Sequence, residues 1–228
     1  MSHGHKHHHG HHHESEGYNH DHHGHGECCF GGARVGKPVE DFTMEVYDPE
    51  EGFFGTVNLE KIKEQKKWTV LFFYPADFTF VCPTELADLA SKHEELKKLG
   101  CEVVAVSTDT KFSHMAWKTS ERLLENVRYK MAADPTGKVS RYYGVYDPES
   151  GLALRGTFII NPEGVLVSSE VNFYNVGRNA DELVRKMDAN NYLLGHPAEA
   201  CPAKWVPGDK TLTPSEKLVG KVYEALNS

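Results

Sequence analysis

A continuous apolar run, Thr69–Tyr74, constrains the fold of this chain more than any other feature. A strand without polar alternation is buried on both faces, so its sheet must carry helices on both sides. The run ends at Pro75, and Cys82 follows just before Pro83, where a helical pattern begins and continues to about Leu99. Because proline is favoured in the first turn of a helix, we expect Cys82 to lie at a helix N-terminus.

The position of Cys82 makes it a candidate nucleophile. Free N–H groups and the positive end of the helix dipole favour an anion there, and the reactive form of cysteine is the thiolate. We expect this sulfur to be charged and open to small oxidants, able to attack a peroxide oxygen, an acyl carbon or a disulfide. Acyl chemistry usually needs a histidine base. The histidines of the main body have no neighbours that mark them as bases, and we expect them to be structural or exposed: His93, His114 and His196.

Charge and composition exclude several classes of function. The 228-residue chain has a net charge of −8 and no basic block in its body, which argues against nucleic acid or an anionic membrane surface as a partner. No apolar stretch approaches the about 20 residues of a membrane-spanning helix. The N-terminus lacks both an apolar signal core and an Arg-rich targeting pattern. Five cysteines do not indicate a secreted disulfide framework, so we predict a cytoplasmic protein.

Residues 1–33 form a low-complexity segment, and 12 of the 15 histidines lie in residues 1–27. Such a segment cannot bury a core, and we predict a disordered extension. Its imidazoles, with the thiols of Cys28 and Cys29, could bind nickel, zinc or copper loosely. A purification tag or a fortuitous repeat is the alternative, but the runs are interrupted, which favours a native metal-binding tail. The candidate ligands are His7, His8, His9, His11, His12 and His13.

Alternating strands and helices follow, and they predict an α/β fold whose mixed sheet is covered on both faces. We assign residues 34–195 to this domain and residues 196–228 to a C-terminal arm. A terminal helix is expected from Thr213, as N-cap, to about Leu226. The other expected helices span residues 57–65, 83–99, 111–125, 136–143 and 179–193, and the strands span 69–74, 103–106, 131–133, 155–160 and 165–171.

A cysteine at the start of a helix, directly after a central strand, is the thioredoxin-like arrangement. Thioredoxins carry Cys-x-x-Cys, whereas Glu85 stands here where the second cysteine would be. Cys82 therefore has no resolving thiol in its own helical turn, which weighs against a disulfide carrier. Cys101 begins a predicted buried strand and is expected to be inert.

Two cysteine motifs make a more specific resemblance. The segment Pro75-x-x-x-Thr79-x-x-Cys82 resembles the active-site motif of the peroxiredoxins. The segment from His196 to Trp205, around Cys201, resembles the resolving-cysteine motif of their typical two-cysteine class, of the alkyl hydroperoxide reductase C type. The resemblance covers roughly residues 35–228 and includes residues 107–117, 134–137 and 176–178.

The resemblance implies a thiol-specific peroxidase that reduces hydrogen peroxide and organic hydroperoxides to water and alcohols without a cofactor. Cys82 would be the peroxidatic thiolate, and Cys201 would attack its sulfenic acid to form a disulfide. The Thr79 hydroxyl would bond the thiolate and the incoming peroxide, and Pro75 would shield the sulfur from water. Arg155 would favour the charged form of Cys82 and polarise the peroxide.

The same resemblance implies thioredoxin or a dedicated flavoprotein as reductant, and a head-to-tail homodimer, often in a ring of five dimers. The disulfide would then join two subunits, with residues 111–117 near the dimer–dimer contact, although the spacing of the two cysteines leaves open a bridge within one chain. No Gly-Gly-Leu-Gly loop or terminal Tyr-Phe occurs, which implies resistance to over-oxidation. The competing hypothesis to a thiol peroxidase is a metal-binding or holdase protein with a thioredoxin-like scaffold.

Overall fold

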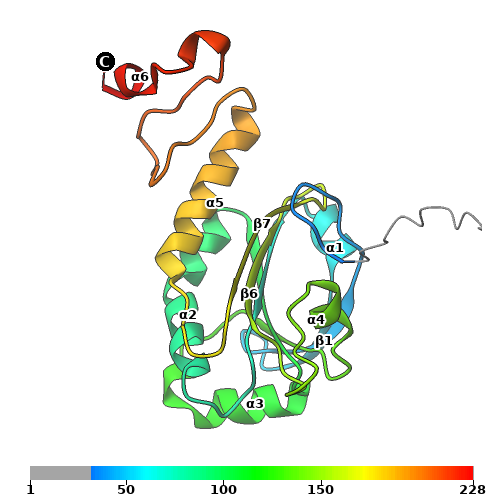
Figure 1. Ribbon diagram of the computed structural model, residues 1–228. Helices are drawn as coiled ribbons and strands as arrows, with labels where there is room; N and C mark the ends of the chain where they lie inside the picture. The colour runs from blue at the N-terminus through cyan, green and yellow to red at the C-terminus, as the bar shows by residue number, and fades with distance from the viewer. Residues whose placement is uncertain (1–31, 228) are drawn as a thin grey trace, which may run out of the picture. The chain divides into compact units, whose positions relative to one another are not determined.

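A seven-stranded mixed sheet forms the centre of residues 32–227, the part of the chain that the computed structural model describes (Figure 1). The strand order is β2-β1-β5-β4-β3-β6-β7. Strands β3, β4 and β5 pair in parallel, and the remaining neighbours pair antiparallel. The histidine runs, Cys28 and Cys29 lie outside the described residues.

The strands are β1 (Thr43–Asp48), β2 (Phe53–Asn58), β3 (Trp68–Phe73), β4 (Cys101–Ser107), β5 (Lys130–Ala133), β6 (Arg155–Ile160) and β7 (Leu166–Asn172). The helices are α1 (Leu59–Glu64), α2 (Cys82–Lys98), α3 (Lys111–Ser120), α4 (Lys138–Tyr142), α5 (Ala180–Gly195) and α6 (Val222–Asn227), with the 3-10 turns η1 (Arg122–Leu124) and η2 (Glu216–Leu218). Within residues 32–227, none of these helices is long and apolar enough to cross a membrane.

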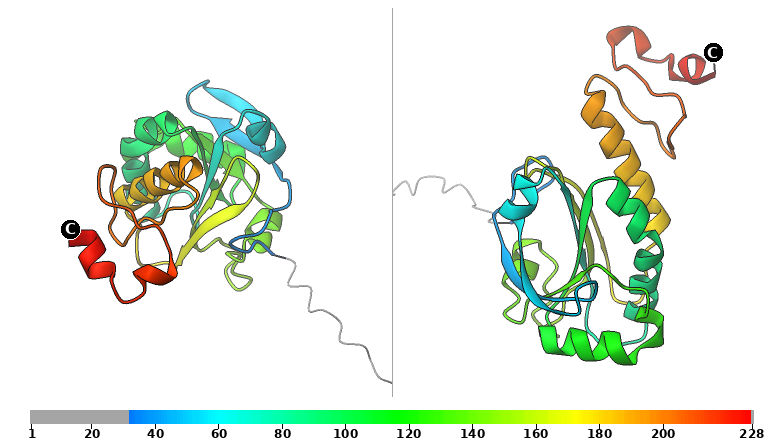
Figure 2. Two further views of the ribbon diagram at one scale, coloured as in Figure 1. Left: turned by 90° about the horizontal axis from the view of Figure 1, so that it is seen from above. Right: turned by 180° about the vertical axis from the view of Figure 1, so that it is seen from behind.

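Strand β3 is buried at every position because helices cover both faces of the sheet. Val70 and Phe72 point into a core shared with α2 and α5. Leu71 and Phe73 point into a second core shared with α1 and α4. Figure 2 shows these two helix layers on opposite sides of the strands. The predicted α/β architecture, with its mixed sheet, is confirmed.

Strands β1 and β2 were not expected from the sequence. Residues 53–58 form an edge strand in which only Val57 is buried, and Gly55 and Thr56 interrupt its apolar residues. Strand β1 alternates between exposed and buried positions over its first four residues, with Met44 and Val46 facing the core. Antiparallel pairing with β1 defines β2 as a strand, and this pairing depends on tertiary contact rather than on local pattern.

The helix expected over residues 111–125 ends earlier, at Ser120. Glu121 is extended, with φ −92° and ψ 114°, and its side chain accepts a hydrogen bond from the Leu123 backbone N–H. This carboxylate therefore starts the short turn η1 instead of continuing α3.

The prediction of one terminal helix from Thr213 is wrong. Helical structure begins only at Glu216, after Ser215, and Gly220 separates η2 from α6 with a left-handed φ of 74°. Neither η2 nor α6 buries a residue. Since short helices depend on packing for most of their stability, nothing here holds the segment in one continuous helix.

Gly156 in β6 allows a close approach that a larger residue would prevent. A Cβ atom there would lie 2.7 Å from the Phe158 ring and 2.8 Å from Val145. We expect Gly156→Ala to lower the free energy of unfolding by about 1–3 kcal/mol, because the added methyl group overpacks the core. Urea unfolding monitored by tryptophan fluorescence measures this change.

Gly55→Ala is the matched control in another strand, since its Cβ would meet only Val46, at 3.8 Å. We expect a change within about 0.5 kcal/mol there. Equal losses in the two variants would contradict the steric argument.

Candidate active site

Cys82 is the first residue of α2, with Pro83 in the first turn, as the sequence predicts. The preceding residue, Val81, offers no side-chain cap to the free N–H groups of that turn. The Cys82 side chain has no exposed surface, so the expectation of a sulfur open to small oxidants is wrong for this conformation. A peroxide reaches the sulfur only when neighbouring side chains move.

The loop between β3 and α2 holds the other residues of the first motif. Pro75 is buried at the end of β3. The Thr79 hydroxyl donates to the Ala76 carbonyl oxygen at 2.8 Å, within the loop itself. Phe78 has a left-handed φ of 56°, a strained conformation for an aromatic residue, and Phe80 is 93% exposed. The loop therefore combines a buried proline with a strained backbone and exposed aromatic side chains.

Arg155, the first residue of β6, brings a positive charge to Cys82. Its Nη1 donates to the Cys82 Sγ at 3.4 Å, and its Nε donates to the Tyr174 carbonyl oxygen at 2.8 Å. Burial opposes the charge of Arg155, but the hydrogen bond to Cys82 and the charge of Glu85 outweigh it and raise the pKa of Arg155. A guanidinium beside a sulfur favours the thiolate, the form that attacks an electrophile.

Glu85 lies between two buried guanidinium groups. Its Oε2 accepts from the Arg155 Nη1 at 2.5 Å, and its Oε1 accepts from the Arg178 Nε at 2.9 Å and from the Arg178 backbone N–H at 2.8 Å. These three charged side chains are each at most 4% exposed. Arg178 also packs over the Phe72 ring, 3.4 Å from its centroid, and burial lowers the pKa of Arg178 although Glu85 opposes the shift.

The three ionised side chains of this cluster do not balance in charge among themselves. Arg155 and Arg178 carry two positive charges, and Glu85 supplies one negative charge. The Cys82 sulfur lies 3.4 Å from the Arg155 Nη1, on the positively charged side of this cluster. The Arg155 guanidinium is therefore placed beside the Cys82 sulfur inside a buried, charged cluster.

From the sequence, Glu85 stands out only as the residue in place of a second cysteine, and its role in the charge cluster is not predicted. A signal was present, because positions 82, 86 and 89 form the buried face of α2 and position 85 lies on that same face. A charged residue on a buried helix face must have an opposite charge beside it. Its partners could not be predicted, because they come from β6 and from the loop before α5.

A second buried network anchors the active-site loop. Asp77 accepts from the Tyr74 hydroxyl at 2.8 Å and lies 2.8 Å from the His114 Nδ1, while the His114 Nε2 lies 3.1 Å from the Ala132 carbonyl oxygen. Both ring nitrogens of His114 are thus engaged away from Cys82. His93 lies on α2 beside Tyr129, and His196 is exposed and stacks on Tyr192. None of these histidines within the described residues serves as a base for Cys82, which disfavours acyl chemistry.

The other two described cysteines have different surroundings. Cys101 is buried at the start of β4, and burial raises the pKa of its thiol to about 12, which fits the expected inert role. Cys201 is partly buried in the arm beyond α5. Cys82, Cys101 and Cys201 are all free thiols in this structure.

Comparison with known proteins assigns this site to a family. A profile described as the AhpC/TSA family matches residues 35–169, and a profile described as the C-terminal domain of 1-Cys peroxiredoxin matches residues 196–225. The chain belongs to the AhpC/TSA family of peroxiredoxins. Alkyl hydroperoxide reductase C proteins of Staphylococcus saprophyticus and Staphylococcus aureus are each 46% identical over 188 residues, which cover 82% of this chain and 98% of theirs.

Solved peroxiredoxin structures share the fold. The crystal structure of Enterococcus faecalis AhpC has a TM-score of 0.70 and 42% identity, covering 75% of this chain and 99% of that chain. The reduced 2-Cys peroxiredoxin of Plasmodium vivax has a TM-score of 0.75 and 33% identity, covering 80% and 94%. The thioredoxin-like fold predicted from the sequence is confirmed by these neighbours.

Family membership establishes the reaction class. This peroxiredoxin is an enzyme that catalyses thiol-dependent reduction of peroxides. The predicted function class is therefore confirmed. Peroxiredoxin catalysis is carried by cysteine sulfur and needs no cofactor. Among residues 32–227, no group of three or more histidine, cysteine or acidic side chains could hold a metal ion.

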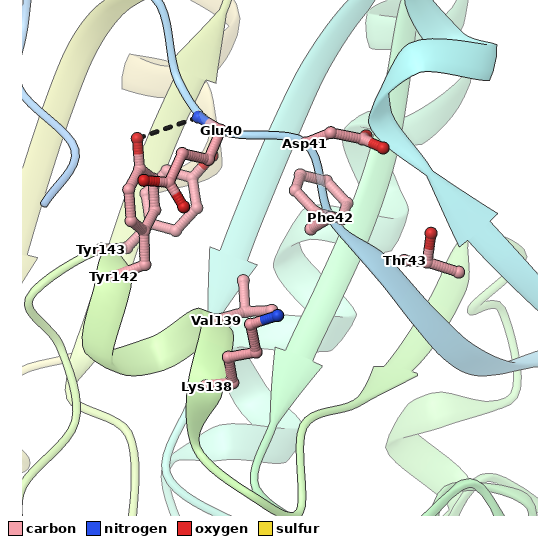
Figure 3. A pocket seen from close by; sticks show the side chains of 8 residues that line it. All are labelled: Glu40, Asp41, Phe42, Thr43, Lys138, Val139, Tyr142 and Tyr143. Atoms are coloured by element: carbon pink, nitrogen blue, oxygen red, sulfur yellow. Dashed lines mark hydrogen bonds between the residues drawn. The ribbon is translucent and has the colours of Figure 1, made fainter.

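An open cavity of about 310 Å³ lies elsewhere on this peroxiredoxin (Figure 3). It is formed where the chain enters β1 and passes α4, on the sheet face opposite α2. It contains no thiol, so it is not the reaction site. Its lining residues are Glu40, Asp41, Phe42, Thr43, Lys138, Val139, Tyr142 and Tyr143.

The buried charge cluster makes a prediction about stability. Glu85→Gln removes the carboxylate charge and leaves Arg155 and Arg178 buried without their anion. We expect the free energy of unfolding to fall by about 3–5 kcal/mol, measured by urea unfolding. Glu60→Gln is the matched control, because its ion pair with Lys63 is exposed and worth about 0–1 kcal/mol. A loss at position 85 no larger than that of the control would show that the cluster does not stabilise the fold.

Proposed function

We propose that Cys82 is the peroxidatic residue of this enzyme. The supporting observation is the hydrogen bond from the Arg155 guanidinium to the Cys82 sulfur, at 3.4 Å, at the start of α2. The thiolate attacks one peroxide oxygen, the O–O bond breaks, and the departing oxygen takes a proton to leave as water or an alcohol. Cys82 is oxidised to a sulfenic acid, and the peroxide is reduced.

The loop residues assist this step. Thr79 turns its hydroxyl from the Ala76 carbonyl oxygen toward the bound peroxide, and Arg155 stabilises the charge that develops on the departing oxygen. Pro75 excludes water from the sulfur. The strained and exposed segment around Phe78 opens to admit the substrate.

Cys201 is the resolving residue in this proposal. Residues 34–195 carry the peroxidase chemistry, and the arm of residues 196–228 brings Cys201 to the sulfenic acid of the partner subunit in a head-to-tail homodimer.

Five dimers form a ring, with α3 near the contact between dimers. Thioredoxin or a dedicated flavoprotein reduces the disulfide in the cytoplasm. The similarity to alkyl hydroperoxide reductase C and to a 2-Cys peroxiredoxin supports this arrangement.

One equivalent of peroxide followed by a non-reducing gel tests the two cysteines. The wild type is expected to give a disulfide-linked dimer. Cys82→Ser is expected to lose both the dimer and at least 99% of the peroxidase activity, roughly a hundredfold or more, because the attacking sulfur is gone. Cys201→Ser is expected to consume one peroxide per chain without forming the dimer.

Cys101→Ser is the matched control, since its thiol is buried and its pKa is raised. It is expected to behave as the wild type. Normal peroxide turnover by Cys82→Ser would overturn the proposed assignment.

We also propose that the histidine tail binds nickel, zinc or copper loosely, at several sites rather than one. The support is compositional, since residues 1–27 hold 12 of the 15 histidines. Calorimetric titration of the full chain and of residues 34–228 tests this idea. We expect heat of binding for each metal from the full chain alone, because the imidazole ligands lie in the tail. Equal heats from the two proteins would contradict it.

A further inference from the structure

The segment that carries Cys201 is a closed loop docked on α5. The backbones of Ala200 and Leu212 exchange two hydrogen bonds, of 2.8 and 3.0 Å, which close residues 200–212 at their base. Trp205 is 3% exposed and packs on Tyr192 of α5, with ring centroids 5.0 Å apart. The loop returns along the end of α5 (Figure 1). Cys201 therefore lies in a hydrogen-bonded loop that packs on α5.

Glu199 joins the three segments that meet at the base of this loop. Its Oε2 accepts a hydrogen bond from the Tyr192 hydroxyl at 2.9 Å. The same oxygen accepts a hydrogen bond from the Thr211 hydroxyl. Tyr192 belongs to α5, and Thr211 lies at the far end of the loop, so one carboxylate ties both ends of the loop to the helix.

The present surroundings of both sulfurs restrain disulfide formation. Cys201 is partly buried in the loop, and Cys82 has no exposed surface under the active-site loop. A disulfide needs the two sulfurs about 2 Å apart, with their Cα atoms within about 7 Å. Cys82 must therefore leave its buried position, and the Glu199 contacts oppose any movement of Cys201 out of its loop.

We propose that Glu199 is a positioning residue of the resolving step, a latch that holds the Cys201 loop closed on α5 and limits the rate of disulfide formation. The inference rests on the proposed function. In the step itself, the Cys201 sulfur attacks the sulfenic sulfur of Cys82, the S–S bond forms and the S–O bond breaks. The hydroxide leaves with the thiol proton as water, so Cys201 is oxidised and the sulfenic acid is reduced.

The electrostatics of the closed loop agree with a latch. Hydrogen bonds from Thr211 and Tyr192 lower the pKa of Glu199, so the carboxylate is charged at neutral pH. Burial raises the pKa of Cys201, the negative charge of Glu199 raises it further, and Arg185 on α5 opposes the shift. The closed loop therefore keeps Cys201 as a thiol, which is less reactive than a thiolate.

Three variants test the latch in the full chain: Glu199→Gln, Tyr192→Phe and Thr211→Val. After rapid mixing with hydrogen peroxide and acid quenching, mass spectrometry measures the sulfenic and disulfide forms over time. Each variant is expected to form the disulfide roughly threefold to tenfold faster than the wild type, as the loss of one hydrogen bond from the closed state allows. The rate of Cys82 oxidation is expected to stay unchanged.

Two further measurements distinguish a latch role of Glu199 from a role in fold stability alone. Tyr192→Phe added to Glu199→Gln is expected to cause little further acceleration of disulfide formation, because that hydrogen bond is already weakened. The peroxide concentration that over-oxidises half of Cys82 is expected to rise by the same factor as the rate, since faster resolution shortens the life of the sulfenic acid.

Matched controls come from the end of the arm, where the side chains are exposed: Glu224→Gln, Tyr223→Phe and Thr213→Val. These are expected to leave the disulfide rate unchanged. Normal oxidation of Cys82 with an unchanged or slower disulfide rate in all three latch variants overturns the latch alone. A wild-type chain that forms no sulfenic acid overturns the proposed function as well.

Discussion

The buried carboxylate of Glu85 is the contact on which the active site depends. It receives hydrogen bonds from Arg155 and Arg178, and so brings together α2, β6 and the loop before α5. Two guanidinium groups at this depth would be unstable without an anion beside them. Of the two guanidinium groups, that of Arg155 also donates a hydrogen bond to the Cys82 sulfur. The same charges thus join three segments of the fold and place a guanidinium against the Cys82 sulfur.

The loop between β3 and α2 is firmly anchored at its start and strained further along. Asp77 anchors the start of the loop through Tyr74 and His114, in a network without access to solvent. Beyond it, Phe78 has a left-handed backbone and Phe80 is almost fully exposed. In the proposed mechanism, this tip opens to admit the peroxide while the end of β3 and the start of α2 keep their places.

Local contacts also hold the segment around Cys201, in the C-terminal arm. A closed backbone loop, a buried Trp205 and the carboxylate of Glu199 hold the loop that carries Cys201 against α5. In a thiol peroxidase, the lifetime of the sulfenic acid depends on how easily the two sulfurs leave their folded positions. In the proposed mechanism, the stability of these local structures sets the rate of disulfide formation.

The sequence alone determined the elements whose cause is local. The apolar run of β3 required helices on both faces, and Pro83 placed Cys82 at a helix start. Only the tertiary structure decided the edge strand β2, which exists through its pairing with β1, and the split terminal helix, which buries no residue. It also decided the partners of Glu85, because a helix pattern reveals a buried charge but not the distant segments that neutralise it.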